Sequence, residues 1–201
     1  MDPEYEALLR EVPRARLLER RSSLLTEFLK KHDLRDPKSV EFSPMKGAIR
    51  LRCFINVEEQ VQRAGGHMET GWVFWEYESI DIHTEAHAIW ITPQGRRVDI
   101  TPRELPPERR ILFLPEPRVA IKRGYTAGYN MVLSSDPRVC AISNFAIKLD
   151  QLFDEHLVEI GVEIAIPTEK IRSAAKRVNL PWEVAQHMTQ RKMEHFSTPC
   201  T

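Results

Sequence analysis

The chain has 201 residues, of which 42% are hydrophobic and 29% charged, and its 29 Lys and Arg side chains balance its 29 Asp and Glu side chains. This composition is typical of a globular protein with one substantial core, and the zero net charge gives no general attraction to nucleic acid or to an anionic membrane. No apolar run approaches the roughly 20 residues of a membrane span and the first residues are acidic and polar, so we expect a cytoplasmic protein without a membrane partner, although export by a machine that reads other signals would leave the same sequence.

The first predicted elements are helical. Helical periodicity runs from Tyr5 to Val12, and a second run from Arg14 to Lys31 places leucine and phenylalanine side chains on one face, which predicts a helical hairpin or one kinked helix. Basic residues alternate with glutamates along the second run, as on a solvated helix face; the alternative is a phosphate-binding patch. The stretch from Asp33 to Pro44 contains two prolines and predicts a linker. We therefore expect an N-terminal helical arm over residues 1–36.

Cys53 lies where two predicted elements meet. The alternating apolar run from Ala48 to Arg52 predicts a strand, and the segment from Phe54 to Ala64 has helical spacing that stops at Gly65-Gly66. A cysteine at a helix N-terminus is close to the positive end of the helix dipole, which favours its thiolate. Cys53 is therefore a candidate nucleophile, and the alternative is a small apolar residue buried in the core.

The next predicted elements contain the tryptophans. A loop from Gly65 to Gly71 precedes a long predicted strand from Trp72 to Ile82, whose first residues are apolar on both faces, as in a central strand. Trp72, and Trp90 on the following strand, are then either core residues or the aromatic wall of a substrate cleft.

A β-hairpin is predicted around Pro93-Gln94-Gly95, with strands from Ala86 to Thr92 and from Arg97 to Thr101. Proline suits the first position of a type I turn and glycine the left-handed position after it, which together give a three-residue loop with a glycine bulge. With this loop, His87 and Asp99 lie on one face as diagonal neighbours, roughly 7 Å apart at the backbone and within reach of a hydrogen bond. A two-residue turn would place them on opposite faces, so the prediction depends on the turn.

The rest of the chain predicts short strands followed by helices. The strands are expected over residues 111–114, 119–122 and 131–133, and the helices over residues 142–160, 167–179 and 181–196. The sequence as a whole predicts an α+β fold in which an antiparallel sheet packs against the cysteine-bearing helix. We expect a core over residues 37–135 and a C-terminal helical region over residues 136–201 that packs on this core as one domain.

Four short motifs carry a resemblance to a known family. They are Cys53-Phe54-Ile55-Asn56, Gly71-Trp72, His87-Ala88-Ile89-Trp90 and Asp99-Ile100-Thr101-Pro102. Together they resemble the papain-like and transglutaminase-like cysteine superfamily, and more narrowly small bacterial and phage proteins with C-x-x-N, G-W and H-A-x-W elements. The resemblance implies a core of that type, with Cys53 as the nucleophile, His87 as the general base and Asp99 as the group that orients the imidazole.

One part of the family pattern is absent. No glutamine precedes Cys53 closely enough to match the papain oxyanion residue, so the oxyanion donor would be the Cys53 backbone N–H or another group such as Asn56. Trp72 and Trp90 are the candidate substrate-binding residues.

A thiolate, an imidazole and a carboxylate are the parts of acyl-transfer catalysis. We expect a cysteine-dependent enzyme that acts on amides of a protein or peptide substrate, as a protease, a deamidase or a transglutaminase, and that needs no cofactor or metal. The sequence does not distinguish these outcomes, because the choice of acceptor depends on the shape of the cleft. It also leaves the oligomeric state open.

Two alternatives belong to other functional classes. One is a peptide-binding module of the same fold that performs no chemistry. The other is a metal protein in which Cys53, His67, His83 and His87 supply ligands. The region around His83 predicts strands, where a four-residue spacing does not converge on one ion, and the chain contains neither C-x-x-C nor H-E-x-x-H. The three cysteines are widely spaced and do not suggest a disulfide framework.

Overall fold

A computed structural model describes residues 3–10, 15–18, 22–103, 110–119, 126–156 and 166–197 of the chain. The fold is α+β and contains a sheet that forms a small barrel. The chain divides into two compact units: the first contains residues 1–14, 77–82 and 122–201, and the second contains residues 15–76 and 83–121. The candidate catalytic residues all belong to the second unit.

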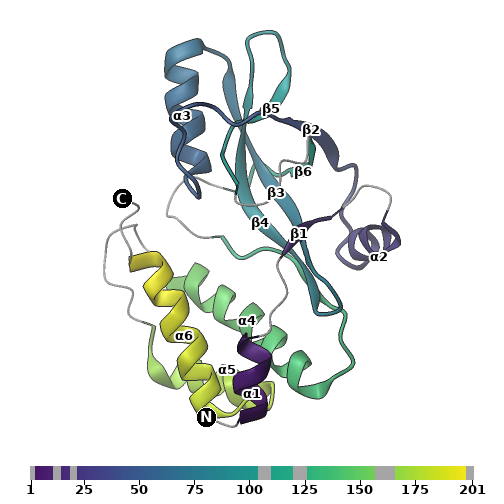
Figure 1. The fold of residues 1–201 in the computed structure, drawn as a ribbon, viewed down its shortest axis with the longest axis vertical. Helices are drawn as coiled ribbons and strands as arrows, with labels where there is room; N and C mark the ends of the chain where they lie inside the picture. The colour runs from purple at the N-terminus through teal and green to yellow at the C-terminus, as the bar shows by residue number, and fades with distance from the viewer. Residues whose placement is uncertain are drawn as a thin grey trace. The chain divides into compact units, whose positions relative to one another are not determined.

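The second unit is built on the sheet and two helices (Figure 1). In chain order its elements are β1 (Arg16–Leu17), α2 (Ser23–Lys31), β2 (Lys38–Phe42), α3 (Cys53–Ala64), β3 (His67–Tyr77), β4 (Asp81–Ile91), β5 (Arg97–Asp99) and β6 (Arg110–Pro115). The strand order is β1-β3-β6-β2-β5-β4, and a further pairing between β3 and β4 joins the two sides of the sheet. This extra pairing is what allows the sheet to close into a barrel.

The strand pairs are mostly antiparallel. This holds for β1 with β3, β2 with β6, β3 with β6 and β4 with β5. The pair of β2 and β5 is parallel, with Glu41 opposite Val98 and Phe42 opposite Asp99. The predicted antiparallel sheet is therefore wrong at this one pair, which places the end of β2 beside Asp99.

One side of the sheet carries the apolar core of the second unit. The core residues are Leu17, Val40, Val73, Ile89, Ile91, Ile111 and Phe113. The helix α2 packs against β3 outside this cluster: its Phe28 is fully buried and makes an edge-on contact with Phe74, with ring centroids 5.8 Å apart. This contact explains why α2, predicted to belong to a separate arm, is part of the second unit. The compact units therefore do not follow the predicted division at residues 36 and 135.

The first unit is mainly helical (Figure 1). Its elements are α1 (Pro3–Arg10), the short strand β7 (Asn130–Val132), α4 (Pro137–His156), α5 (Thr168–Arg177) and α6 (Trp182–Ser197). Buried side chains from all four helices form a single cluster that includes Tyr5, Phe145 and Val184. Residues 77–82, at the turn between β3 and β4, join this unit where the Leu133 N–H donates to the Ile80 carbonyl (2.8 Å). The predicted C-terminal helices are confirmed within the described residues.

Several sequence predictions are corrected by the structure. The run from Ala48 to Arg52 is a loop and turn, and the strand lies earlier, at β2, inside the stretch predicted as a linker. The predicted strand from Trp72 to Ile82 is interrupted by a turn at residues 78–80, where Ser79 has a φ of 60°. The predicted loop from Gly65 to Gly71 contains the start of β3, and the predicted helix from Arg14 contains β1. The ends of the helices predicted at 5–12 and 142–160, and all but the first residue of the strand at 119–122, lie outside the described residues.

None of the helices in the described part of the chain combines the length and the apolar character that a membrane span requires.

Candidate active site

The hairpin of β4 and β5 has the register that the sequence predicts. The Thr92 N–H donates to the Arg96 carbonyl (2.9 Å), and Trp90 lies opposite Val98. Gly95 has a φ of 79°, the left-handed conformation expected at the end of the three-residue loop. In this register Ile89 is opposite Asp99, so His87 is the diagonal neighbour of Asp99.

His87 and Asp99 form a buried hydrogen bond. The His87 Nε2 atom lies 2.9 Å from Asp99 Oδ1, and the two residues are 2% and 0% exposed. The Thr101 backbone N–H also donates to Asp99 Oδ1 (3.2 Å). Because the carboxylate accepts hydrogen bonds only, it holds the imidazole in one orientation. The predicted contact between these two residues is confirmed.

Arg103 completes the environment of Asp99, and sequence analysis did not identify it. Its Nη2 and Nε atoms donate to Asp99 Oδ2 at 2.8 and 3.3 Å. Its guanidinium also lies over the ring of Trp75, 5.2 Å from the centroid, and the Trp75 indole donates to Glu85 (2.6 Å). The arginine is therefore held from two sides, with an aromatic face on one and the buried carboxylate on the other.

The contacts of His87 Nε2 with Arg103 and Asp99 indicate which ring nitrogen carries the proton. Arg103 Nη2 lies 3.2 Å from His87 Nε2, but a guanidinium can only donate, so this contact would be a hydrogen bond only if Nε2 carried no proton. Asp99 Oδ1 is closer and needs a donor, which assigns the Nε2 proton to the bond with Asp99. The Nδ1 atom is then the ring nitrogen left to accept a proton from a nucleophile.

Cys53 is the candidate nucleophile. It is the first residue of α3 and packs in an apolar cluster with Val57, Ala88 and Val98, so the helix lies against the β4–β5 hairpin. The Cys53 side chain is 6% exposed and lies close enough to the His87 ring to raise the pKa of that imidazole. The sequence predicted that the sulfur and the imidazole lie close together, and the structure places Cys53 near enough to influence the pKa of His87.

The loop before α3 is fixed to the strand that carries Asp99. After β2, the Ser43 and Met45 N–H groups donate to the carbonyls of Asp99 and Ile100 at 2.9 and 3.0 Å. This ladder continues the parallel pairing of β2 with β5 and brings the chain alongside the hairpin just before it turns into α3. The sulfur is positioned by the sheet as well as by its own helix.

Charge stabilises the buried pair. Burial alone would lower the pKa of His87, but attraction to Asp99 and Cys53, with hydrogen bonds to both, raises it to about 10. Burial likewise opposes ionisation of Asp99, but His87 and Arg103 lower the pKa of Asp99 to about 2. With the pKa of His87 raised and that of Asp99 lowered, the pair is an imidazolium and a carboxylate near neutral pH, and Cys53 lies beside the ring.

Comparisons with protein-family models, curated proteins and solved structures found no match. What this chain does must therefore be inferred from its own side chains.

Asn56 stabilises the loop that precedes Cys53. Its Oδ1 accepts the Ile49 N–H (2.9 Å), and its Nδ2 donates to the Ile49 carbonyl (2.7 Å) and to Thr101 Oγ1 (3.2 Å). Both amide hydrogens are used, so these bonds conflict with the predicted role of Asn56 as an oxyanion donor. The first backbone N–H groups of α3 are the other candidate donors, and the side chain of Arg52 at the N-cap makes no capping bond to them.

The two candidate substrate-binding tryptophans have different surroundings. Trp72 is buried in β3, opposite Leu114. The Trp90 indole donates to the Gly65 carbonyl (2.9 Å), which ties the end of α3 to β4. Trp90 also lines a cavity, whereas Trp72 does not.

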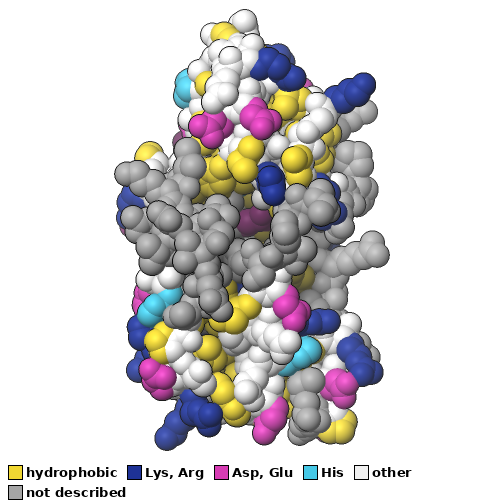
Figure 2. Space-filling view, turned by 90° about the vertical axis from the view of Figure 1, so that its left-hand side faces the viewer, with side chains coloured by type: hydrophobic (Ala, Val, Ile, Leu, Met, Phe, Trp, Pro, Cys, Tyr) yellow, Lys and Arg dark blue, Asp and Glu magenta, His cyan; other side chains and the backbone are white. Residues whose placement is uncertain are grey.

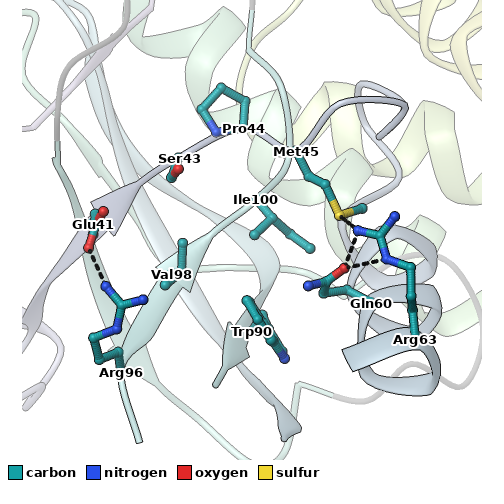
Figure 3. Close-up of a pocket in the computed structure, with 10 residues that line it drawn as sticks. All are labelled: Glu41, Ser43, Pro44, Met45, Gln60, Arg63, Trp90, Arg96, Val98 and Ile100. Atoms are coloured by element: carbon teal, nitrogen blue, oxygen red, sulfur yellow. Dashed lines mark hydrogen bonds and ion pairs between the residues drawn. The ribbon is translucent and has the colours of Figure 1, made fainter. Parts of the chain in front are cut away.

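This cavity lies between α3 and the sheet and has a volume of about 240 Å³ (Figure 3). Trp90, Val98 and Ile100 form its apolar part, and polar residues lie around it: Glu41 is paired with Arg96, and Arg63 contacts Gln60 and Met45. None of Cys53, His87 and Asp99 lines it. Gln60 is two helical turns from Cys53, roughly 10 Å along the axis, so we do not assign this cavity as the reaction site.

The residues considered for a metal do not gather into a site. Within the described residues, no three His, Cys, Asp or Glu side chains form a group that could hold a metal ion. His83 lies on β4, where a residue four positions from His87 does not share its surroundings as it would on a helix.

Proposed function

We propose that this chain is a cysteine-dependent acyl-transfer enzyme of the papain-like and transglutaminase-like type, acting on amides of a protein or peptide substrate. The observation that carries the proposal is the buried hydrogen bond between His87 and Asp99, together with Cys53 close enough to the ring to raise the pKa of His87. The elements around it also have the expected order, with the sulfur at a helix N-terminus and the ring and carboxylate on neighbouring strands.

The reaction follows from the positions of the protons. The Cys53 sulfur, having passed its proton to His87 Nδ1, attacks the carbonyl carbon of the amide and forms a carbon–sulfur bond. The oxyanion is stabilised by backbone N–H groups at the start of α3. As the carbon–nitrogen bond breaks, His87 returns the proton to the departing amine, leaving a thioester.

The second half of the reaction releases the acyl group. His87, now neutral, takes a proton from water or from a second amine as that molecule attacks the thioester. The carbon–sulfur bond breaks and the sulfur regains its original state. Water gives cleavage or deamidation, and an amine gives a transglutaminase product. Asp99 accepts the Nε2 hydrogen bond throughout. This bond keeps the imidazole oriented toward the sulfur and keeps the proton on Nε2.

The first experiment tests the pairing of sulfur and imidazole. In a Cys140→Ser/Cys200→Ser background Cys53 is the only thiol, because the chain has three cysteines. We expect iodoacetamide to alkylate Cys53 faster near neutral pH than it alkylates a free cysteine peptide, and His87→Ala to remove this advantage. His83→Ala is the matched control, because it removes a histidine from the same strand. Alkylation at the rate of the free peptide in the parent protein would contradict the proposal.

The second experiment tests turnover. Cells that express the parent protein or Cys53→Ala are compared across the proteome for new protein termini, deamidated side chains and cross-linked peptides. The proposal expects at least one of these products only with the parent protein, and the purified target should give the same product in vitro. A product that Cys53→Ala also makes would remove this mechanism.

A further inference from the structure

The loop that leads into α3 exposes an unusual group of side chains. Ile49, Leu51 and Ile55 are 44%, 60% and 42% exposed, and among the described residues no other large hydrophobic side chain is exposed to this degree. All three lie within four positions of Cys53 in the sequence. Single exposed apolar residues are normal on a protein surface, but a group of them beside one functional residue marks an interaction site.

The same loop is basic. From Pro44 to Val57 the sequence contains Lys46, Arg50 and Arg52 and no Asp or Glu. Lys46 and Arg50 are exposed. We call the exposed side chains of Lys46, Ile49, Arg50, Leu51 and Ile55 the collar, and its chemistry combines apolar surface with positive charge. On the side of the molecule that carries α3, hydrophobic side chains are seen beside Lys and Arg (Figure 2).

The collar is held in a fixed and strained conformation. Leu51 has a φ of 61°, a left-handed conformation that leucine rarely adopts. The three hydrogen bonds of the buried Asn56 amide, two of them to the Ile49 backbone, hold the loop in place. A large apolar side chain exposed to solvent at such a position does not pack in the core, so we infer that it contacts a binding partner.

We propose that the collar recognises a protein segment in which apolar residues alternate with acidic ones, and that it presents this segment to Cys53. This inference rests on the proposed function, since it names the substrate class of the same site. Apolar side chains of the segment cover Leu51 and its neighbours, while its carboxylates face Lys46 and Arg50. The preformed loop reduces the entropy that binding would otherwise cost.

An anionic membrane would offer similar chemistry, but the exposed face of α3 argues against it. Glu58 and Glu59 follow Ile55 on this helix, and both are exposed. A helix that enters an anionic interface places Lys and Arg along its polar face, whereas these glutamates would be repelled. A peptide segment is short enough to contact the collar alone.

The experiment measures binding without catalysis. Fluorescence anisotropy is recorded with Cys53→Ala protein and three labelled peptides that share one backbone length: one with alternating leucine and glutamate, one with serine for leucine and one with lysine for glutamate. We expect the first peptide to bind about tenfold more tightly than either of the others, and its affinity to fall as salt rises.

Two variants assign the binding to the collar. Leu51→Asn keeps a residue that tolerates the left-handed conformation and removes the apolar side chain, and it should weaken the first peptide about tenfold. Lys46→Glu/Arg50→Glu should reverse the preference between the glutamate and lysine peptides. Lys30→Glu/Lys31→Glu, which changes two exposed lysines of α2 by the same charge, is the control and should leave the preference unchanged.

Several results would overturn the inference. They are equal affinity for the three peptides, equal losses in the collar and control variants, preferential binding to vesicles of phosphatidylserine and phosphatidylcholine, and a dimer in sedimentation that Leu51→Asn dissociates. The alkylation experiment separates this inference from the proposed function. Selective binding without a reactive Cys53 would support the binding role of the collar and contradict the proposed enzymatic function. A reactive Cys53 without selective binding would support the enzymatic function and contradict the binding role.

Discussion

Replacing Arg103 with glutamine should destabilise the second unit by about 3 kcal/mol. Arg103 donates two hydrogen bonds to Asp99, at 2.8 and 3.3 Å, and Asp99 is fully buried. Removing one partner of a buried ion pair costs about 3–5 kcal/mol, because the remaining charge is left without compensation. The lower figure applies because His87 and the Thr101 N–H still bind the carboxylate.

The assay can be restricted to the unit that holds the site. The chain has four tryptophans, and Trp72, Trp75 and Trp90 all belong to the second unit, whereas Trp182 belongs to the first. In a Trp182→Phe background, tryptophan fluorescence during urea unfolding therefore reports on the second unit alone. This matters because two compact units need not unfold in one transition.

Arg97→Gln is the matched control. Arg97 also forms two hydrogen bonds to a carboxylate, at 2.7 and 2.9 Å to Glu69, but the two side chains are 41% and 23% exposed. An exposed pair contributes only about 0–1 kcal/mol, so this variant should change the free energy of unfolding little. Equal losses in the two variants would refute the reasoning, because burial of the Asp99 charge would then not be the source of the cost.

Four further predictions concern pH, packing and strain. The pKa of His87 is raised from the ordinary 6.5 to about 10, so the pairing of His87 stabilises the fold fully below pH 6.5 and less as the pH rises toward 10. The free energy of unfolding should therefore fall between these two pH values. His87→Gln should abolish this part of the pH dependence. Asp99, whose pKa is lowered from 3.8 to about 2, adds stability above pH 3.8 that acid titration should show disappearing through pH 2. Gly71→Ala should cost about 3 kcal/mol in urea unfolding, because its Cβ would lie 2.1 Å from the Leu114 carbonyl oxygen, and an unchanged midpoint would contradict the observed strand spacing. Leu51→Gly should leave the free energy of unfolding unchanged or raise it by up to about 1 kcal/mol, because relief of the left-handed backbone strain exceeds any lost packing. A clear destabilisation would show that Leu51 packs in the core.

The hairpin was predictable because its geometry is local. A proline and a glycine at fixed positions select a three-residue loop, the loop sets the register, and the register decides which side chains share a face. The contact of His87 with Asp99 follows from these steps, and so does the start of α3 at Cys53, which depends on helical spacing and the two glycines that end it. No long-range information was needed for either prediction.

Arg103 was not predictable by the same means. It follows Pro102 in a segment without periodicity, and its partners are set by how the chain leaves β5. The cation–π contact with Trp75 joins it to β3, a strand distant in the sequence. Only one local signal was available: an arginine lies four residues after the carboxylate predicted to orient His87, and a carboxylate that becomes buried needs a partner.

The most informative wrong prediction concerns the residues before Cys53. Ile49 and Leu51 alternate with arginines, and such alternation normally indicates a strand with one face on a core. In the structure these apolar side chains are exposed, and the backbone at Leu51 is left-handed. A sequence selected only for stability would place a polar residue at Ile49, where the side chain is exposed, and a glycine or asparagine at Leu51, where the backbone is left-handed. The residues present depart from both preferences, and each departure costs stability. The parallel pairing of β2, the amide of Asn56 and the packing of α3 offset this cost, and the last two act within four residues of Cys53. The failure of the local pattern and the nearby position of the candidate nucleophile therefore have one explanation under the proposal, a surface that binds a partner.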